Sequence, residues 1–327
     1  MDQYRLSSHD DVPDREPFLA ALSELEALTF SHYDGVVHST PEFLRWYTAR
    51  PGMRQDLCQA AFAGEQLVAN VFVTLAPMML GGEVVTCGIL DTVMTHPNHR
   101  RRGLATELLQ RALAAMAAGG ADVSLLYTAR EDPMLAPERL YGSLDYAPRE
   151  LVTRFMRPAA AVLSGPAPIR SAHSSIRHLF AEALGRDDGW ILLDDQLWQW
   201  RRVARPRQYP VSLHVTGTGA AAAICSGELI LSGARRPLTV VSDIVLPLGD
   251  GAKTAFESLL AAAPAMAPVT VLCPQSDARM VDLLSGLGFA AAGAETVMMR
   301  GITDRGAAAL ARPLSGWYVA VESVIGV

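Results

Sequence analysis

The chain has 327 residues, of which 50% are hydrophobic and 19% are charged, and its formal net charge is −6. This length suits two domains, and the composition predicts packed cores rather than a disordered chain. The acidic balance argues against nucleic acid as the main partner. The absence of a long apolar run, of a signal-peptide pattern and of any C-x-x-C pair argues against a membrane partner, secretion and a zinc site. We therefore expect a cytoplasmic protein that binds no metal, nucleic acid or membrane.

The first elements alternate between helices and strands. Residues 14–30, rich in Ala, Leu and Glu, predict a helix, and Thr40 with Pro41 predicts the capped start of a second helix that reaches Tyr47. Strands with intervening glycine turns are then predicted over 57–63, 67–80 (with a break near Pro77) and 83–95. After them, a helix from Gly103 to about Ala118 and a strand over 123–127 complete a βαβ unit.

An Arg/Gly loop, Arg100-Arg101-Arg102-Gly103-Leu104-Ala105, stands at the start of that helix. A helix N-terminus presents unpaired backbone N–H groups and the positive end of the helix dipole, so with three arginines it suits a diphosphate. Neither a Walker loop nor a G-x-G-x-x-G fingerprint occurs. Physical reasoning alone leaves an ordinary solvated arginine run as an equal alternative.

These residues resemble the GCN5-related N-acetyltransferases (GNAT). The loop matches the family pattern [R/Q]-x-x-G-x-[G/A], and Val93 to Pro97 is similar to the family's V-x-V-x-P strand. Leu140 to Tyr146 is similar to F-Y-x-x-x-G-F, with Leu140 in place of Phe, Asp145 in place of Gly and Tyr146 in place of the final Phe. The resemblance implies acetyl-CoA as the co-substrate. The residues that it implies for binding are Val93, Met94, Thr95, Arg100, Arg101, Arg102, Gly103, Leu104, Ala105 and Thr106.

The second half repeats the first half faintly. Residues 158–168 form a connector of small residues and prolines, so we expect a catalytic GNAT domain over 1–157 and a second domain over 169–327. The second domain has no arginines in the loop over 246–251, and Leu283 or Leu284 stands where the first half has Tyr141. We therefore expect an α/β (α+β) fold of two tandem GNAT-like domains. Each has a mixed, mostly antiparallel sheet flanked by helices, and the second is degenerate; an unrelated α/β domain is the alternative.

The elements expected in the second half are helices over 171–183, 194–203, 252–263 and 277–287 and strands over 211–215, 220–225, 228–231, 239–245, 269–273 and 295–300. The tandem plan is partly similar to the acetyltransferases of the enhanced-intracellular-survival type, which carry a larger C-terminal domain. The apolar, alternating tail from Trp317 to Val327 predicts a buried strand.

Acyl transfer to an amine requires a proton acceptor, a donor to the carbonyl oxygen and an acid for the leaving thiolate. The resemblance assigns the acid to Tyr141, whose alternative is a core aromatic; a phenol pKa of about 10 lies close to that of a thiol. Asp91 is a candidate base or a simple cation-binding group. The terminal carboxylate of Val327 is a second candidate base by the survival-type analogy.

The acceptor pocket is expected between the first helices and later loops. Phe43, Trp46 and Tyr47 are candidates to line it, although such a cluster is also typical of a core. Asp132, beside Glu131, is a candidate to hold a cation. The prediction is an acetyl-CoA-dependent N-acetyltransferase that acts on a primary amine of a small molecule in a ternary complex. The alternatives are another acyl-CoA as donor, or a non-catalytic acyl-CoA-binding protein; self-association through the second half is expected by analogy.

Overall fold

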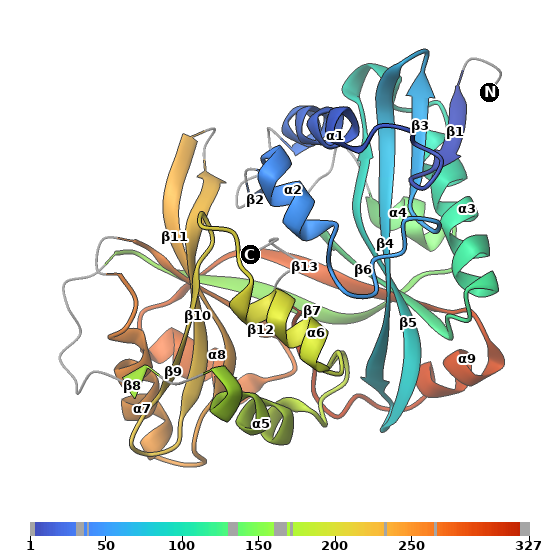
Figure 1. Ribbon diagram of the computed structural model, residues 1–327. Coiled ribbons are helices and arrows are strands. Elements are labelled where there is room, and N and C mark those ends of the chain that lie inside the picture. Colours follow the sequence, from blue (N-terminus) through green and yellow to red (C-terminus); the bar gives the residue numbers. More distant parts are fainter. Residues whose placement is uncertain are drawn as a thin grey trace.

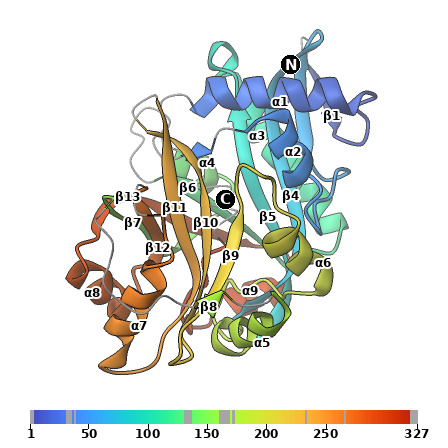
Figure 2. The same ribbon diagram turned by 60° about the vertical axis from the view of Figure 1, so that its left-hand side comes forward.

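The computed structural model describes residues 4–30, 36–37, 39–129, 137–159, 169–170, 173–231, 234–264 and 267–320. Within these ranges one mixed sheet runs through the whole molecule, in the order β1-β3-β4-β5-β6-β13-β7-β12-β11-β10-β9-β8, with β2 on β10 (Figure 1). Helices flank it (Figure 2), which confirms the predicted mixed α/β class. No helix in the described ranges is long and apolar enough to span a membrane.

The elements before residue 160 are β1 (Arg5–Ser8), α1 (Arg15–Phe30), β2 (Val36–Val37), α2 (Pro41–Tyr47), β3 (Gln59–Ala63), β4 (Gln66–Leu80), β5 (Glu83–Thr95), a 3₁₀ turn (Pro97–His99), α3 (Leu104–Ala118), β6 (Val123–Ala129), α4 (Pro137–Gly142) and β7 (Ala147–Arg157). Those that follow are β8 (Ile169–Arg170), α5 (His173–Leu184), α6 (Asp195–Trp198), a π-helical turn (Gln199–Val203), β9 (Val211–Val215), β10 (Ala221–Leu231), β11 (Ala234–Val245), α7 (Gly251–Leu260), β12 (Val269–Pro274), α8 (Ala278–Gly286), β13 (Ala290–Gly301) and α9 (Asp304–Leu310).

The two halves exchange strands. Strand β13, from the end of the chain, lies between β6 and β7 and is antiparallel to both. Strand β7 in turn pairs with β12 of the second half. The two predicted sheets are therefore joined into one, although the division of the chain at 158–168 stays a prediction.

A parallel βαβ unit positions the Arg/Gly loop. Strand β5 pairs with β6 over Cys87–Ile89, and helix α3 connects them. One face of α3 is buried, at Leu104, Leu108, Leu109, Ala112, Leu113 and Met116. In the described residues no pairing of β5 with β6 continues beyond Ile89, so the last part of β5 leaves its neighbour and carries its backbone toward the loop.

Each half has a β-bulge on the strand that precedes its crossover helix. On β5 one extra residue opposes β4 between Asn70 and Phe72, and Thr92 takes a left-handed φ of 49°. On β11 the same shift occurs opposite Ala221 and Ala223, and Asp243 has a φ of 51°. Because a non-glycine residue is rarely left-handed, a matching bulge in both halves supports an internal repeat.

Two predicted breaks were wrong. Strand β4 runs through Pro77 because its partner Thr86 directs its N–H to the Asp122 carboxylate on the other side, so no donor is required from Pro77 there. Strand β10 runs through Gly227, predicted as a gap between two strands. A Cβ on Gly227 would lie 2.4 Å from the Tyr209 ring, so this glycine admits an aromatic ring rather than a turn.

The tail is described only as far as Ala320. Its residues Trp317–Ala320 are buried, as expected, but they form a single β-bridge, between Trp317 and Asp188, and no strand element. The Trp317 indole donates to the hydroxyl of Tyr127 on β6 at 3.2 Å. The rest of the predicted strand, with Val327, lies outside the described residues.

Candidate active site

The Arg/Gly loop turns the chain from β5 into α3. Arg101 has a φ of 59° and Gly103, the N-cap of α3, a φ of 79°. A Cβ on Gly103 would meet nothing within 4 Å, so glycine is required here for its backbone angle rather than for space. No side chain caps the helix start. The first N–H groups of a 15-residue helix therefore remain for an anion, as in other anion-binding turns.

The three arginines of the loop differ in where their side chains point. Arg100 points inward, where its guanidinium donates to the carbonyl oxygens of Thr95 at 3.2 Å and of Thr29 at 3.4 Å, and so fixes the loop against α1. Arg101 and Arg102 are exposed. Arg102 also donates to the hydroxyl of Tyr4 at 3.1 Å. Two guanidinium groups therefore face solvent beside the helix start, as a diphosphate site requires.

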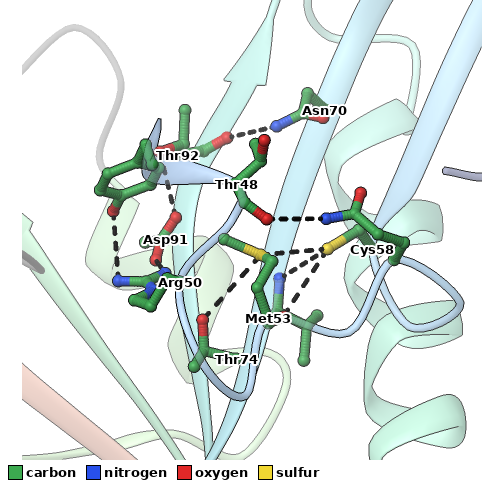
Figure 3. Close-up of polar contacts among 11 residues, drawn as sticks. Thr48, Arg50, Met53, Cys58, Asn70, Thr74, Asp91 and Thr92 are labelled. Atoms are coloured by element: carbon green, nitrogen blue, oxygen red, sulfur yellow. Dashed lines mark hydrogen bonds and ion pairs between the residues drawn. The ribbon is translucent and has the colours of Figure 1, made fainter. Parts of the chain in front are cut away.

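A buried amide holds the bulge on β5. The Asn70 side chain donates to the carbonyl oxygen of Thr92 at 3.2 Å (Figure 3), and its own oxygen lies 2.8 Å from His9 Nε2. Because the Asn70 oxygen can only accept, His9 Nε2 carries the proton. Burial lowers the pKa of His9 to about 4, so the ring is neutral at pH 7.

An ion pair secures the bulge from the other side. Arg50, in the turn after α2, donates to the Asp91 carboxylate at 2.6 Å, and each side chain is only 5% exposed (Figure 3). The Thr92 hydroxyl also donates to Asp91, at 3.1 Å. Asp91 lies on β5 directly before the left-handed Thr92 of the bulge, but its negative charge is already compensated by a guanidinium.

The second half repeats this pair. At its bulge Asp243 accepts from the guanidinium of Arg202, which follows α6 as Arg50 follows α2. The tail residue Tyr318 donates its hydroxyl to the same carboxylate at 2.6 Å. A buried Arg–Asp pair is therefore a shared structural device of the two halves, and at Asp91 it need not indicate catalysis.

Tyr141 is buried on the short helix α4, which contacts β6. Its ring packs edge-to-face on Tyr146 with centroids 6.1 Å apart. The Tyr146 hydroxyl donates to Ser124 Oγ on β6 at 2.6 Å. Thr296 of β13 also donates to Glu138 of α4 at 2.8 Å, so the exchanged strand helps to hold this helix. Burial, with a smaller effect of the Glu295 charge, raises the pKa of Tyr141 and keeps the phenol protonated.

The predicted acceptor residues lie where the two halves meet. Trp46 stacks on Trp200 with centroids 4.5 Å apart and planes 8° apart, and the Trp200 indole donates to the Trp46 carbonyl at 2.9 Å. Phe43 and Tyr47 are buried beneath them, and Phe43 meets the edge of Tyr209. The contacts thus show an aromatic interface, while a role in holding a substrate stays a prediction. Asp132 lies outside the described residues.

The sequence analysis missed Glu26. Its half-buried carboxyl on α1 accepts a hydrogen bond from Ser39 Oγ at 2.6 Å. Burial raises its pKa to about 7, and the nearby Asp91 charge adds to the effect. Glu26 follows Leu22 by four residues and so falls on the buried stripe of α1, which is the sequence signal that could have found it.

The described residues contain no cluster of three or more His, Cys, Asp or Glu side chains that could hold a metal ion. A family model for the acetyltransferase (GNAT) domain matches residues 22–149, which include the bulge, the Arg/Gly loop and Tyr141. Residues 22–149 therefore form a GNAT domain. GNAT enzymes use acyl-CoA, and the protein is accordingly an acyl-CoA-dependent acyltransferase.

Solved structures share the fold over nearly the whole length of this chain. A GCN5-related N-acetyltransferase from Anabaena variabilis is 15% identical with a TM-score of 0.63, over 93% of this chain and 74% of that one. Saccharomyces cerevisiae N-myristoyltransferase with bound myristoyl-CoA is 13% identical with a TM-score of 0.70, over 92% of this chain and 80% of that one. Eis1 from Mycobacterium abscessus is 15% identical, with a TM-score of 0.55 over 94% and 75%. No curated protein matches. At these identities the likeness extends to the fold alone.

Proposed function

We propose that the protein transfers the acetyl group of acetyl-CoA to a primary amine of a small molecule, by direct attack within a ternary complex. The observation that carries the proposal is the Arg/Gly loop. There the left-handed Arg101 and Gly103 open the start of α3, and two exposed guanidinium groups stand beside it. A CoA diphosphate matches this site in charge and in its demand for backbone donors.

The departure of β5 from β6 supports the placement of the rest of the cofactor. In the proposal the pantetheine arm pairs with the backbone of Val93, Met94 and Thr95 as an added strand would. The thioester carbonyl then lies at the bulge, where a backbone N–H near Met94 stabilises the oxyanion. Tyr141, which is protonated and lies on α4 against β6, gives its proton to the departing thiolate.

The acceptor enters from the side of α1 and α2, opposite α3. Its amine lies near Asp91 and the aromatic group of Phe43, Trp46 and Tyr47. The tight pair with Arg50 favours Asp91 as a residue that fixes the bulge over Asp91 as the base. The base role of the Val327 carboxylate and the cation-binding role of Asp132 stay predictions.

Calorimetry with acetyl-CoA, desulfo-CoA and adenosine tests the cofactor site. We expect acetyl-CoA and desulfo-CoA to bind and adenosine not to bind. The double substitution Arg101→Ala/Arg102→Ala should weaken acetyl-CoA binding at least tenfold, because charge-assisted bonds to a diphosphate contribute roughly 1.5–3 kcal/mol each. The matched control is Arg235→Ala/Arg236→Ala, two adjacent exposed arginines of the second half. An equal loss of acetyl-CoA affinity in both double variants would contradict the proposal that the Arg/Gly loop binds the diphosphate.

Thiol release with a panel of small amines then tests transfer. Acetyl-CoA is compared with longer acyl-CoA donors, because the N-myristoyltransferase neighbours bind myristoyl-CoA. Faster thiol release with a longer acyl-CoA would mean that this acyl group, and not acetyl, is the one that the protein transfers. Binding without release for any amine or donor would favour a non-catalytic acyl-CoA-binding protein.

A further inference from the structure

A carboxyl on α1 stands close to the bulge and outside the Arg50–Asp91 pair. We propose that Glu26, and not Asp91, accepts the proton from the ammonium group of the acceptor. This inference rests on the proposed function and assigns its general base. Three sets of observations carry it: the way Glu26 is held, the way Asp91 is occupied, and the groups that surround Glu26.

Glu26 is held in place by the segment that leads into α2. Ser39 Oγ donates to Glu26 Oε1 at 2.6 Å, and the backbone carbonyl of Ser39 accepts from Ser23 Oγ at 2.5 Å, one turn earlier on α1. Ser39 directly precedes Thr40, whose side chain caps α2. The carboxyl is thereby fixed between α1 and the start of α2, and helix α1 itself contacts β5. A base must be fixed in this way if it is to meet its substrate in one geometry.

Asp91 and Glu26 differ in the groups that compensate the negative charge of their carboxylates. Asp91 receives the Arg50 guanidinium and the Thr92 hydroxyl, so taking up a proton would break a buried ion pair. No described arginine, lysine or histidine forms an ion pair with Glu26, and the hydrogen bond that its carboxylate accepts from Ser39 comes from a neutral hydroxyl. Protonation of Glu26 therefore sacrifices a weaker interaction than protonation of Asp91 would.

The groups around Glu26 adjust it for proton transfer near neutral pH. Burial raises its pKa to about 7, the Ser39 hydroxyl opposes this by stabilising the carboxylate, and the Asp91 charge on β5 raises the pKa further. Burial and, to a smaller degree, the Glu26 charge in turn raise the pKa values of Tyr47 on α2 and of Tyr209 in the second half, so both phenols are protonated at neutral pH. A base whose pKa lies near the working pH is the most effective one.

The step balances without a further reactant. The ammonium R–NH3⁺ gives one proton to the Glu26 carboxylate, and the neutral amine attacks the thioester carbon. A C–N bond forms and the C–S bond breaks. The thiolate takes the phenolic proton of Tyr141, and the nitrogen releases its second proton, which restores Tyr141 through solvent. Glu26 returns its proton to solvent after product release.

The test is the pH dependence of kcat/KM at saturating acetyl-CoA, with the best amine of the panel. In wild-type protein we expect activity to rise with pH through an acidic limb near pH 7. Glu26→Gln should lose this limb and at least about 100-fold in kcat/KM, the lower end of the range for general base catalysis. Its acetyl-CoA affinity should stay within about twofold. Glu24→Gln, an exposed carboxylate of the same helix, is the matched control and should match wild-type protein.

A second variant separates a base from a merely structural residue. Ser39→Ala removes the bond that stabilises the Glu26 carboxylate, so the acidic limb should move to higher pH while the plateau remains. A limb that is unchanged in both Glu26→Gln and Ser39→Ala would overturn the assignment of Glu26 and leave the proposed transfer intact. Absence of turnover in wild-type protein with every amine would instead overturn the proposed function, and this inference with it.

Discussion

The side-chain amide of Asn70 donates to the carbonyl oxygen of Thr92, the one residue of β5 with a left-handed backbone. This bond links a fully buried side chain of β4 to the bulge at which the thioester carbonyl is proposed to lie. Asn70→Leu would leave both the Thr92 carbonyl and His9 Nε2 without their buried partner, at a cost of about 1–3 kcal/mol for each group. We expect a lower urea midpoint and a lower kcat.

The control for Asn70 is Thr74→Val, a buried substitution on the same strand away from the bulge. It should cost about 1 kcal/mol or less, because the Thr74 hydroxyl makes only a weak contact with a sulfur, at 4.0 Å. If Asn70→Leu lowers stability but leaves kcat at the wild-type value, the bond supports the fold and does not position the reaction.

Tyr141→Phe should lower kcat by roughly 100-fold, since general acid catalysis contributes at least that factor. The acetyl-CoA affinity measured by calorimetry should change little, because the phenol acts on the departing thiolate. The matched control is Tyr146→Phe, which removes the neighbouring bond to Ser124 and should cost about 1 kcal/mol of stability with kcat retained. An unchanged kcat in Tyr141→Phe would identify the ring as a core aromatic.

The Arg50–Asp91 pair should behave as a buried structural pair. Arg50→Met leaves the Asp91 carboxylate buried without its guanidinium and should cost about 3–5 kcal/mol of unfolding free energy. The double substitution Arg50→Met/Asp91→Leu should recover most of that loss, because no charge remains to be desolvated. Chemical denaturation of the two variants checks this. A double variant no more stable than Arg50→Met would show that the cost comes from lost packing around Tyr47 and Trp200.

Local patterns in the sequence predicted local structure well. Strand β5 has the predicted bounds, Thr40 caps α2, and helix α3 covers the predicted residues to within one position, because each depends on residues within a few positions of one another. The Arg/Gly loop belongs to the same class, since a glycine at a helix start and its arginines are contiguous. The break predicted near Pro77 was wrong, because a proline interrupts a strand only where the partner requires its N–H. Whether that is so here depends on the direction of the N–H group of its partner Thr86, which the local sequence does not reveal.

Long-range relationships had no such signal. The insertion of β13 between β6 and β7 joins residues more than 130 positions apart, and an apolar alternation is the same whichever strand it pairs with. The partner of Asp91 is likewise Arg50, from a turn that no strand pattern connects to β5. The sequence therefore placed Asp91 on the strand before the Arg/Gly loop but could not show that its charge is compensated, nor that this charge acts on Glu26.

His9 should make the stability of the protein depend on pH. Its pKa is about 4 in the folded protein and about 6.5 in an unfolded chain, so between these values the unfolded chain binds the proton more readily. The contribution of neutral His9 is thus complete above pH 6.5 and is lost as the pH falls toward 4. The difference of about 2.5 pKa units corresponds to about 3 kcal/mol.

Urea midpoints at pH 7, 5.5 and 4.5 measure this effect. Glu26, with a raised pKa, acts in the opposite direction, since its protonated form favours the folded state at lower pH. The comparison is therefore between wild-type protein and His9→Gln, which keeps an N–H donor for Asn70 but cannot titrate. We expect His9→Gln to be less stable at pH 7, where packing around Phe18 and Phe72 is lost, and to lose less stability on acidification. Parallel pH profiles in the two proteins would show that His9 is not the group responsible.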